Sequence, residues 1–182
     1  MIEQPHLDLL LRLNADENPH SGGALLDHLR GTHDLLEAWG CEQRVCLGGL
    51  FHSIYGTQSY KTESASLEDR QQIRDVIGEP AERLAFLFCV SHRWQFFEQV
   101  GQASPVLWNR LDEEDLSVSP EELRDLIEME VANYIEFMPR LDFTREELDT
   151  FQAKVASAKH LITAVARDAI VEAMATKWTQ IE

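Results

Sequence analysis

Apolar residues that recur with the period of an α-helix, bounded by helix start and stop signals, constrain this chain more than any other feature. From Ser21 to Trp39 they fall at every third or fourth position, as Leu25, Leu29, Thr32, Leu36 and Trp39. Gly40 follows as a helix stop, because glycine readily adopts the conformation that ends a helix. The pattern predicts an amphipathic helix over this stretch.

The same signals divide most of the remaining chain into helices. Ser119-Pro120-Glu121-Glu122 places a capping serine before a proline and two acidic residues, which is a strong helix start. Thr144-Arg145-Glu146-Glu147 repeats this arrangement and predicts one long terminal helix that reaches Trp178. Further helices are expected over residues 42–53, over 66–77, from Pro80 onward and over 120–138.

No segment shows convincing β alternation, so we predict an all-α fold, a compact multi-helix bundle. The length of 182 residues suits a single domain over residues 1–182, with residues 144–182 as a long C-terminal helical extension. The acidic run from Asp112 to Asp115 lies in a stretch rich in turn residues, 101–118. We interpret this stretch as a solvated surface connection.

The balance of charge limits the partners of this chain. Lys and Arg number 16 against 32 Asp and Glu, and the formal net charge of -16 repels nucleic acid and anionic membrane surfaces. No stretch is apolar enough to span a membrane, and the N-terminal residues lack the features of a secretion signal. We therefore expect a cytoplasmic protein that binds a small-molecule ligand. The apolar stripe of its terminal helix offers a homodimer interface as an alternative to packing within the domain.

An acidic chain can still bind a small anion where a few basic side chains meet in a cleft. The candidates are Arg30, Arg44, Lys61, Arg70, Arg74 and Arg93. A cleft that holds a few of them would suit a small phosphate ester.

Two of the seven histidines stand where two helices would bring them together. His28 and His52 each lie on the expected inward side of a helix, and the tight corner at Gly40 joins these two helices in an antiparallel arrangement. Imidazole nitrogen is a good ligand for zinc, iron or manganese, and facing helices hold such ligands in fixed positions. The pattern leaves two interpretations open, a pair of metal ligands or a pair of hydrogen-bonded core histidines.

The motif around these histidines can be compared with known families. His28 is followed by the corner at Gly40 and then by Leu47-Gly48-Gly49-Leu50-Phe51-His52. This order resembles the opening of a domain of the HD superfamily of metal-dependent hydrolases, where a His, a helix corner and an apolar helix ending in His-Asp follow one another. Residues 127–135 are similar to the helix that carries the superfamily's last metal-binding Asp, notably in its guanosine-tetraphosphate hydrolase branch. The resemblance covers roughly residues 20–140 and implies an HD-domain-like bundle with His28 and His52 as metal ligands.

Some positions depart from the superfamily pattern. Ser53 stands where the His-Asp pair has its aspartate, and Asn133 stands where the final aspartate would be. A dication held by two imidazoles and no carboxylate binds more weakly and activates water less reliably. Gly56 and Thr57 stand in place of the acidic pair of the tetraphosphate hydrolases. The segment is thus more similar to an uncharacterised bacterial branch with a His-Ser-x-Tyr-Gly-Thr sequence.

Further residues are candidates for completing the site. His20 and His92 are additional candidate metal ligands, and Glu130 or Glu136 would substitute for a missing carboxylate. The predicted ligand-binding residues are Ser53, Tyr55, Thr57, Asn133 and Glu136. The alternative for the Tyr-Gly-Thr segment is a plain turn at the end of a helix. No residue is assigned a catalytic role.

Three functions therefore remain open from the sequence. The first is a metal-dependent hydrolase, using Fe, Mn or Zn, that acts on a small phosphorylated substrate. The second is a metal-free, degenerate HD protein that binds a small ligand or a protein partner. The third is an iron-dependent oxygenase of the HD type. The loss of both aspartates favours the second function, whereas the retention of both histidines favours the first.

Overall fold

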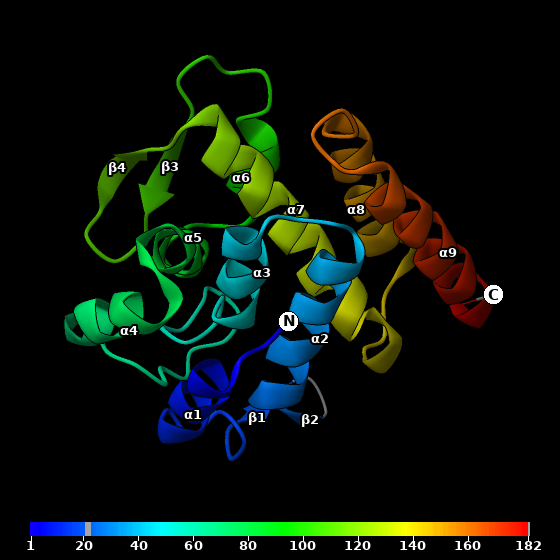
Figure 1. The fold of residues 1–182 in the computed structure, drawn as a ribbon. Helices are drawn as coiled ribbons and strands as arrows, with labels where there is room; N and C mark the ends of the chain where they lie inside the picture. The colour runs from blue at the N-terminus through cyan, green and yellow to red at the C-terminus, as the bar shows by residue number, and fades with distance from the viewer. Residues whose placement is uncertain (21–22, 182) are drawn as a thin grey trace.

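The computed structural model describes residues 1–20 and 23–181, and this part of the chain is mostly helical (Figure 1). The prediction that helices dominate is confirmed. The α-helices are α1 (Gln4–Arg12), α2 (Leu25–Ala38), α3 (Gln43–Leu50), α4 (Arg70–Ile77), α5 (Glu79–Val90), α6 (Trp94–Glu98), α7 (Pro120–Phe137), α8 (Arg145–Ser157) and α9 (Ala164–Ile181). Two 3-10 helices, η1 (Leu67–Asp69) and η2 (Met138–Arg140), are joined to α4 and α7.

The core is organised around α3, which packs against α2, α5 and α7. A Cβ atom at Gly49 would lie 2.4 Å from Cδ1 of Leu36 on α2, so only glycine permits this close approach. A Cβ atom at Gly48 would lie 3.0 Å from Leu84 of α5 and 3.2 Å from Met129 of α7. The two glycines therefore let neighbouring helices approach α3 closely, and the packing brings the end of α3 close to α2 and α7.

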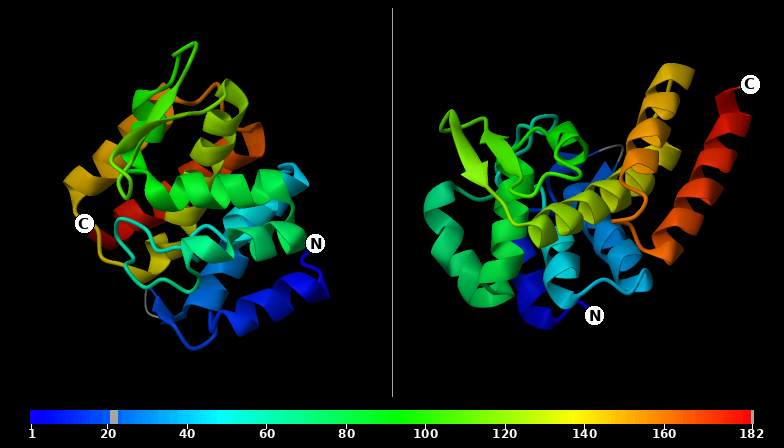
Figure 2. Two further views of the ribbon diagram at one scale, coloured as in Figure 1. Left: turned by 90° about the vertical axis from the view of Figure 1, so that its left-hand side faces the viewer. Right: turned by 90° about the horizontal axis from the view of Figure 1, so that it is seen from above.

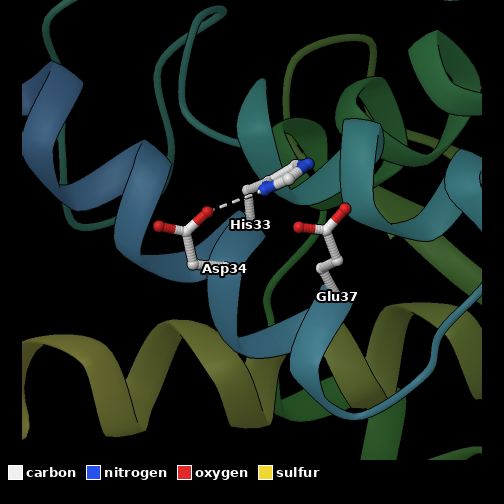
Figure 3. A group of neighbouring side chains, drawn as sticks. All are labelled: His33, Asp34 and Glu37. Atoms are coloured by element: carbon white, nitrogen blue, oxygen red, sulfur yellow. Dashed lines mark hydrogen bonds and ion pairs between the residues drawn. The ribbon is translucent and has the colours of Figure 1, made fainter. Parts of the chain in front are cut away.

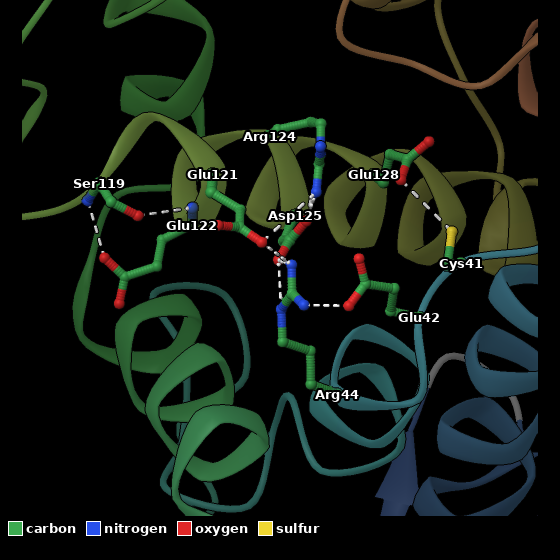
Figure 4. Close-up of polar contacts among 9 residues, drawn as sticks. All are labelled: Cys41, Glu42, Arg44, Ser119, Glu121, Glu122, Arg124, Asp125 and Glu128. Carbon is green, nitrogen blue, oxygen red and sulfur yellow. Dashed lines mark hydrogen bonds and ion pairs between the residues drawn. The ribbon is translucent and has the colours of Figure 1, made fainter.

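Ion pairs also hold α3 against α7 (Figure 4). Nε of Arg44 on α3 donates to Oδ2 of Asp125 at 3.0 Å, and the same guanidinium pairs with Glu121 on α7. Asp125 is buried, and burial raises the pKa of its carboxyl group despite its contacts with Arg124 and Arg44. These contacts fix α7 relative to α3.

The predicted starts of α7 and α8 are confirmed. Oγ of Ser119 accepts a hydrogen bond from the Glu122 amide at 3.0 Å, and the Glu122 carboxylate accepts one from the Ser119 amide at 2.7 Å (Figure 4). Thr144 and Glu147 form the same reciprocal pair at the start of α8. Both capping boxes satisfy amide donors that have no partner within the helix.

Residues 101–118 contain strands where a surface connection was predicted. The strands β3 (Val106–Asn109) and β4 (Glu114–Ser117) form an antiparallel hairpin in which Leu107 pairs with Leu116. The acidic residues at the tip are exposed as expected. The hairpin was missed because its strands are short and because Leu107 gains its burial only from tertiary packing.

A second, smaller hairpin shifts the expected start of α2. Strands β1 (Pro19–His20) and β2 (Gly23–Ala24) are antiparallel, and α2 begins at Leu25 rather than at Ser21, which lies outside the described residues. The helix expected to reach residue 53 also ends earlier, at Leu50, so His52 lies in the turn that follows α3.

The predicted single terminal helix is wrong, because two helices, α8 and α9, replace it. They lie side by side at one edge of the molecule (Figure 2). The amide of Thr163, between the two helices, donates to Oε1 of Glu128 on α7 at 2.8 Å. Arg167 of α9 donates to the carbonyl of Ile162 at 2.7 Å. These contacts give hydrogen-bond partners to backbone groups of the turn between α8 and α9. The local sequence pattern could not reveal this turn. None of the described helices combines the length and apolar character required to cross a bilayer.

Candidate functional site

The side chains of His28, His52 and Asn133 meet in the core of the helical bundle. They come from α2, from the turn after α3, and from α7. Nε2 of His28 lies 3.1 Å from Nε2 of His52, and each nitrogen lies 3.1 Å from Oδ1 of Asn133. All three residues are buried. Three potential ligand atoms therefore form a triangle with equal sides.

Contacts on the outer side of each group aim these atoms inward. Nδ1 of His28 pairs with the carboxylate of Glu136, and Nδ1 of His52 donates to the carbonyl of Gly49 at 2.6 Å. That carbonyl belongs to the last turn of α3, where it also accepts the amide of His52 at 3.5 Å. Nδ2 of Asn133 donates to Oε2 of Glu130 at 3.1 Å. With Nδ1 of each ring in contact with an outer partner, Nε2 of each ring faces the other ring and Oδ1 of Asn133.

Two carboxylates thus lie behind the triangle rather than in it. Burial opposes ionisation of Glu136, but His28 and Arg140 outweigh it and lower the pKa of this carboxyl group. Glu130 is more deeply buried, and desolvation raises its pKa although Arg93 and Asn133 contact it. Neither Glu136 nor Glu130 takes the inward position that was considered for a substitute carboxylate.

The triangle has dimensions that suit a metal ion. Ligand atoms bound to a first-row dication at ~2.1 Å lie ~3.0 Å apart at right angles and ~3.4 Å apart in a tetrahedron. The separations of 3.1 Å fall within this range. Histidine nitrogen with an outward-facing second hydrogen bond is the usual metal-binding arrangement, because the outer partner fixes the ring and its tautomer. The residues present therefore fit a divalent metal.

A cavity of about 390 Å³ opens beside this triangle. Ser53, Thr57 and Asn133, all predicted to bind a ligand, line it, as does Arg93. Nη2 of Arg93 donates to Oγ of Ser59 at 3.0 Å, and Nη1 lies 3.5 Å from Oε2 of Glu130. Of the basic residues considered for anion binding, Arg93 is thus placed at the cavity.

Other basic residues that were considered for anion binding form ion pairs with carboxylates of the chain instead. Arg70 and Arg74 both pair with the buried carboxylate of Glu82, at 2.6 Å and 2.7 Å. Tyr55, predicted to bind a ligand, points to the same carboxylate and donates to it at 3.0 Å. The prediction for Tyr55 is therefore corrected, because its hydroxyl contributes to the core rather than to the cavity.

Two further candidate metal ligands are not brought to the triangle by any described contact. His92 lies between α5 and α6, where its carbonyl accepts a hydrogen bond from the amide of Gln95. The backbone of His20 belongs to β1, and its side chain lies outside the described part of the structure. Glu136, predicted to bind a ligand, instead positions His28 from behind.

Helix α2 also carries a separate group in which one imidazole lies beside two carboxylates (Figure 3). The group consists of His33, Asp34 and Glu37. Nδ1 of His33 lies 3.0 Å from Asp34, and Glu37 pairs with the terminal amino group of Met1. His33 is buried while both carboxylates are exposed. Exposed acidic groups of this kind are common without a metal, and we assign this group no ligand.

Sequence reasoning did not identify a second, larger cavity of about 570 Å³, which adjoins the first. The two cavities share Ser59, Arg93 and Phe137 as lining residues. Four aromatic rings line the second cavity, from Trp94, Tyr134, Phe137 and Phe143. The helical spacing of Tyr134 and Phe137 on α7 favours an ordinary core, and only the arrangement of α6, α7 and α8 leaves the space between them open.

Comparison with known proteins gives one match. Residues 9–93 match the family model described as Domain of unknown function (DUF6817). This span includes His28 and His52, whereas Asn133 and the helices α7, α8 and α9 lie beyond it. No curated protein and no solved structure matches the chain.

Proposed function

We propose that the chain binds a divalent metal ion through His28, His52 and Asn133 and acts as a metal-dependent hydrolase on a small phosphorylated ligand. The triangle of inward-facing donor atoms, 3.1 Å on each side, carries this proposal. The chain order of the three residues also supports the resemblance to the HD superfamily, in which two histidines precede a third ligand on a later helix.

Different residues of the chain would bind the metal ion and orient its ligands at such a site. When bound, a dication would supply positive charge that polarises a phosphoryl group and activates water. The three inward donors are neutral, so they leave this charge undiminished, although they hold the ion less tightly than carboxylates would. Glu136 and the Gly49 carbonyl fix the two rings from outside.

The adjoining cavity supplies the means to hold an anionic ligand. Arg93 brings a permanent positive charge to a chain whose formal net charge is -16, and a guanidinium binds phosphate oxygens in a bidentate manner. The hydroxyl groups of Ser53 and Thr57 line the same cavity and offer hydrogen bonds to the ligand. Oγ1 of Thr57 already accepts from the Tyr60 amide at 3.0 Å, which leaves its own proton to donate.

A second candidate function is binding of the ligand without turnover. It is favoured by the amide of Asn133, which occupies the inward position that a carboxylate has in the HD superfamily. Ser53 likewise lines the cavity where that superfamily has an aspartate. A site without these charges would hold a metal weakly and leave Arg93 and the hydroxyl groups as the main ligand contacts.

The deciding experiment measures metal content and metal affinity. The full chain, purified without affinity-tag metal, is analysed for its elements and then titrated with Zn²⁺, Mn²⁺ and Fe²⁺ beside His52→Ala. His160→Ala serves as the matched control, because His160 is exposed and belongs to a different part of the chain. We expect about one metal per chain in the wild type and the control and a loss of binding in His52→Ala.

Two outcomes would contradict the proposal. One is a wild-type chain that binds none of the three metals, which would leave the metal-free binding function. The other is metal binding that His52→Ala retains. Hydrolysis of a panel of phosphate monoesters by the metal-loaded chain then separates turnover from binding alone. Selective uptake of iron without phosphatase activity would direct the work to the oxygenase alternative.

A further inference from the structure

The larger cavity differs in chemistry from the one beside the metal site. We call it the aromatic chamber, and its volume is about 570 Å³. Trp94 comes from α6, Tyr134 and Phe137 from α7, and Phe143 from the segment before α8. Tyr134 lies 5.4 Å from Phe143 and 6.2 Å from Trp94, measured between ring centroids. The rings therefore form a continuous apolar wall.

Two of these rings, those of Trp94 and Phe143, are in contact with cations of the chain itself. Nζ of Lys154 lies 5.0 Å from the centroid of Trp94, and Nζ of Lys177 lies 5.7 Å from that of Phe143. Glu130, Glu146 and Glu147 line the same space, and Arg93 is the basic residue among its lining residues. A planar aromatic group can offer each ring an edge or a face, while an anionic group of the same ligand is attracted to Arg93 rather than to the carboxylates.

Arg93 lies where the aromatic chamber meets the cavity beside the metal site. An anionic group on Arg93 is therefore within reach of both spaces. We propose that the chain's ligand is an aryl-substituted anion, whose planar aromatic group occupies the aromatic chamber while its anionic group lies on Arg93. This deepens the proposed function and rests on it only in taking the anionic group to be a phosphoryl group.

The C-terminal segment then decides which ligands are accepted. Phe143 and Thr150 line the aromatic chamber and lie outside residues 9–93, the span that matches a family model. The histidine pair lies within that span. The aromatic group thus contacts residues outside that span, and α7 carries both Asn133 of the proposed metal site and Tyr134 and Phe137 of the aromatic chamber.

The test measures ligand binding to the full chain by calorimetry in the presence of a chelator, so that it does not depend on a bound metal. The probes are 1-naphthyl phosphate, ethyl phosphate and phosphocholine. Thr150→Phe places a ring in the aromatic chamber, and Thr150 is an exposed residue of α8, so folding should be retained. Asp149→Phe is the matched control, because Asp149 is an exposed neighbour that does not line either cavity described above.

We expect 1-naphthyl phosphate to bind about tenfold more tightly than ethyl phosphate, because ring contacts add to the burial of the apolar group. Thr150→Phe should abolish this advantage, and Asp149→Phe should retain it. Equal affinity of the wild type for the two phosphates would overturn the proposal, as would tightest binding of phosphocholine or the same result for both variants. None of these results depends on whether His52→Ala loses metal, so failure of the aromatic chamber is distinguishable from failure of the metal site.

Discussion

The carboxylate of Glu82 lies at the centre of a buried polar cluster that supports the segment after His52. It is fully buried and accepts hydrogen bonds from Nε of Arg70 at 2.6 Å, from Nε of Arg74 at 2.7 Å and from the hydroxyl of Tyr55 at 3.0 Å. Tyr55 lies in the same turn as His52. The substitution Glu82→Gln keeps the volume of the side chain and removes its charge, so it tests this cluster without creating a cavity.

The expected loss of stability follows from the partners that remain. Removing one partner of a buried ion pair costs ~3–5 kcal/mol when the other charge cannot reach water. The side chains of Arg70 and Arg74 are 22% and 31% exposed, so both can turn toward solvent. We therefore take the lower end of this energy range and expect the free energy of unfolding to fall by ~3 kcal/mol. For a chain of this size, that loss lowers the melting temperature by roughly 6–12 °C.

The pH dependence gives a second, independent test. Burial alone would raise the pKa of Glu82, but the hydrogen bonds from Arg70 and Arg74 outweigh it and hold the pKa below its ordinary value. A lowered pKa means that the stabilisation is fully present above the unfolded-state pKa, roughly 4.3 for glutamate, and is lost as the pH falls through the lower folded-state value. The difference between wild type and Glu82→Gln should therefore narrow below about pH 4.5.

Urea denaturation followed by far-UV circular dichroism at a series of pH values from 7 down to about 2.5, which spans the region below the unfolded-state pKa, provides the measurement. Glu79→Gln, an exposed position in the first turn of the same helix, is the control and should cost less than ~1 kcal/mol. A loss below about 1 kcal/mol for Glu82→Gln at pH 7, or a difference that stays constant toward low pH, would refute this reasoning.

Three further substitutions test the packing, the cap and the ligand set. Gly49→Ala should destabilise the fold by ~2 kcal/mol in urea denaturation, because the new Cβ atom would lie 2.4 Å from Leu36. Ser119→Ala should cost about 1 kcal/mol in the same assay, because the Glu122 amide loses its acceptor, and an unchanged midpoint would count against the cap. Asn133→Asp should tighten Zn²⁺ binding about tenfold or more by adding a charged ligand, and equal affinities would argue against Asn133 as an inward ligand.

Local sequence signals were sufficient to predict several elements of this fold. The capping boxes at Ser119 and Thr144 predicted the starts of α7 and α8, because their hydrogen bonds join residues three positions apart. Helical periodicity around Gly40 likewise predicted that His28 and His52 would approach each other. The capping contacts depend on a few consecutive residues, whereas the approach of the two histidines, 24 residues apart, depends on the short corner that joins two consecutive helices.

Other features depend on contacts between distant segments. The sequence placed Tyr55 beside His52 but could not show that its hydroxyl turns to Glu82, 27 residues away. The break between α8 and α9 depends on Glu128 of α7, which accepts the amide of Thr163. The hairpin of β3 and β4 gains its buried face only when the core covers Leu107.

The candidate site, too, was predictable in part from the sequence and depends in part on contacts between distant segments. Its residue types could be read from the sequence, including the two histidines and the asparagine at the third position. Which atoms face inward could not, because Glu136 and Glu130 of α7 and the Gly49 carbonyl of α3 decide this through contacts between distant segments. The aromatic chamber is likewise a property of the tertiary structure alone, since the same spacing of rings would serve an ordinary core if α6, α7 and α8 met more closely. Chemistry is carried by single residues, but an open space between helices exists only once the helices have been positioned.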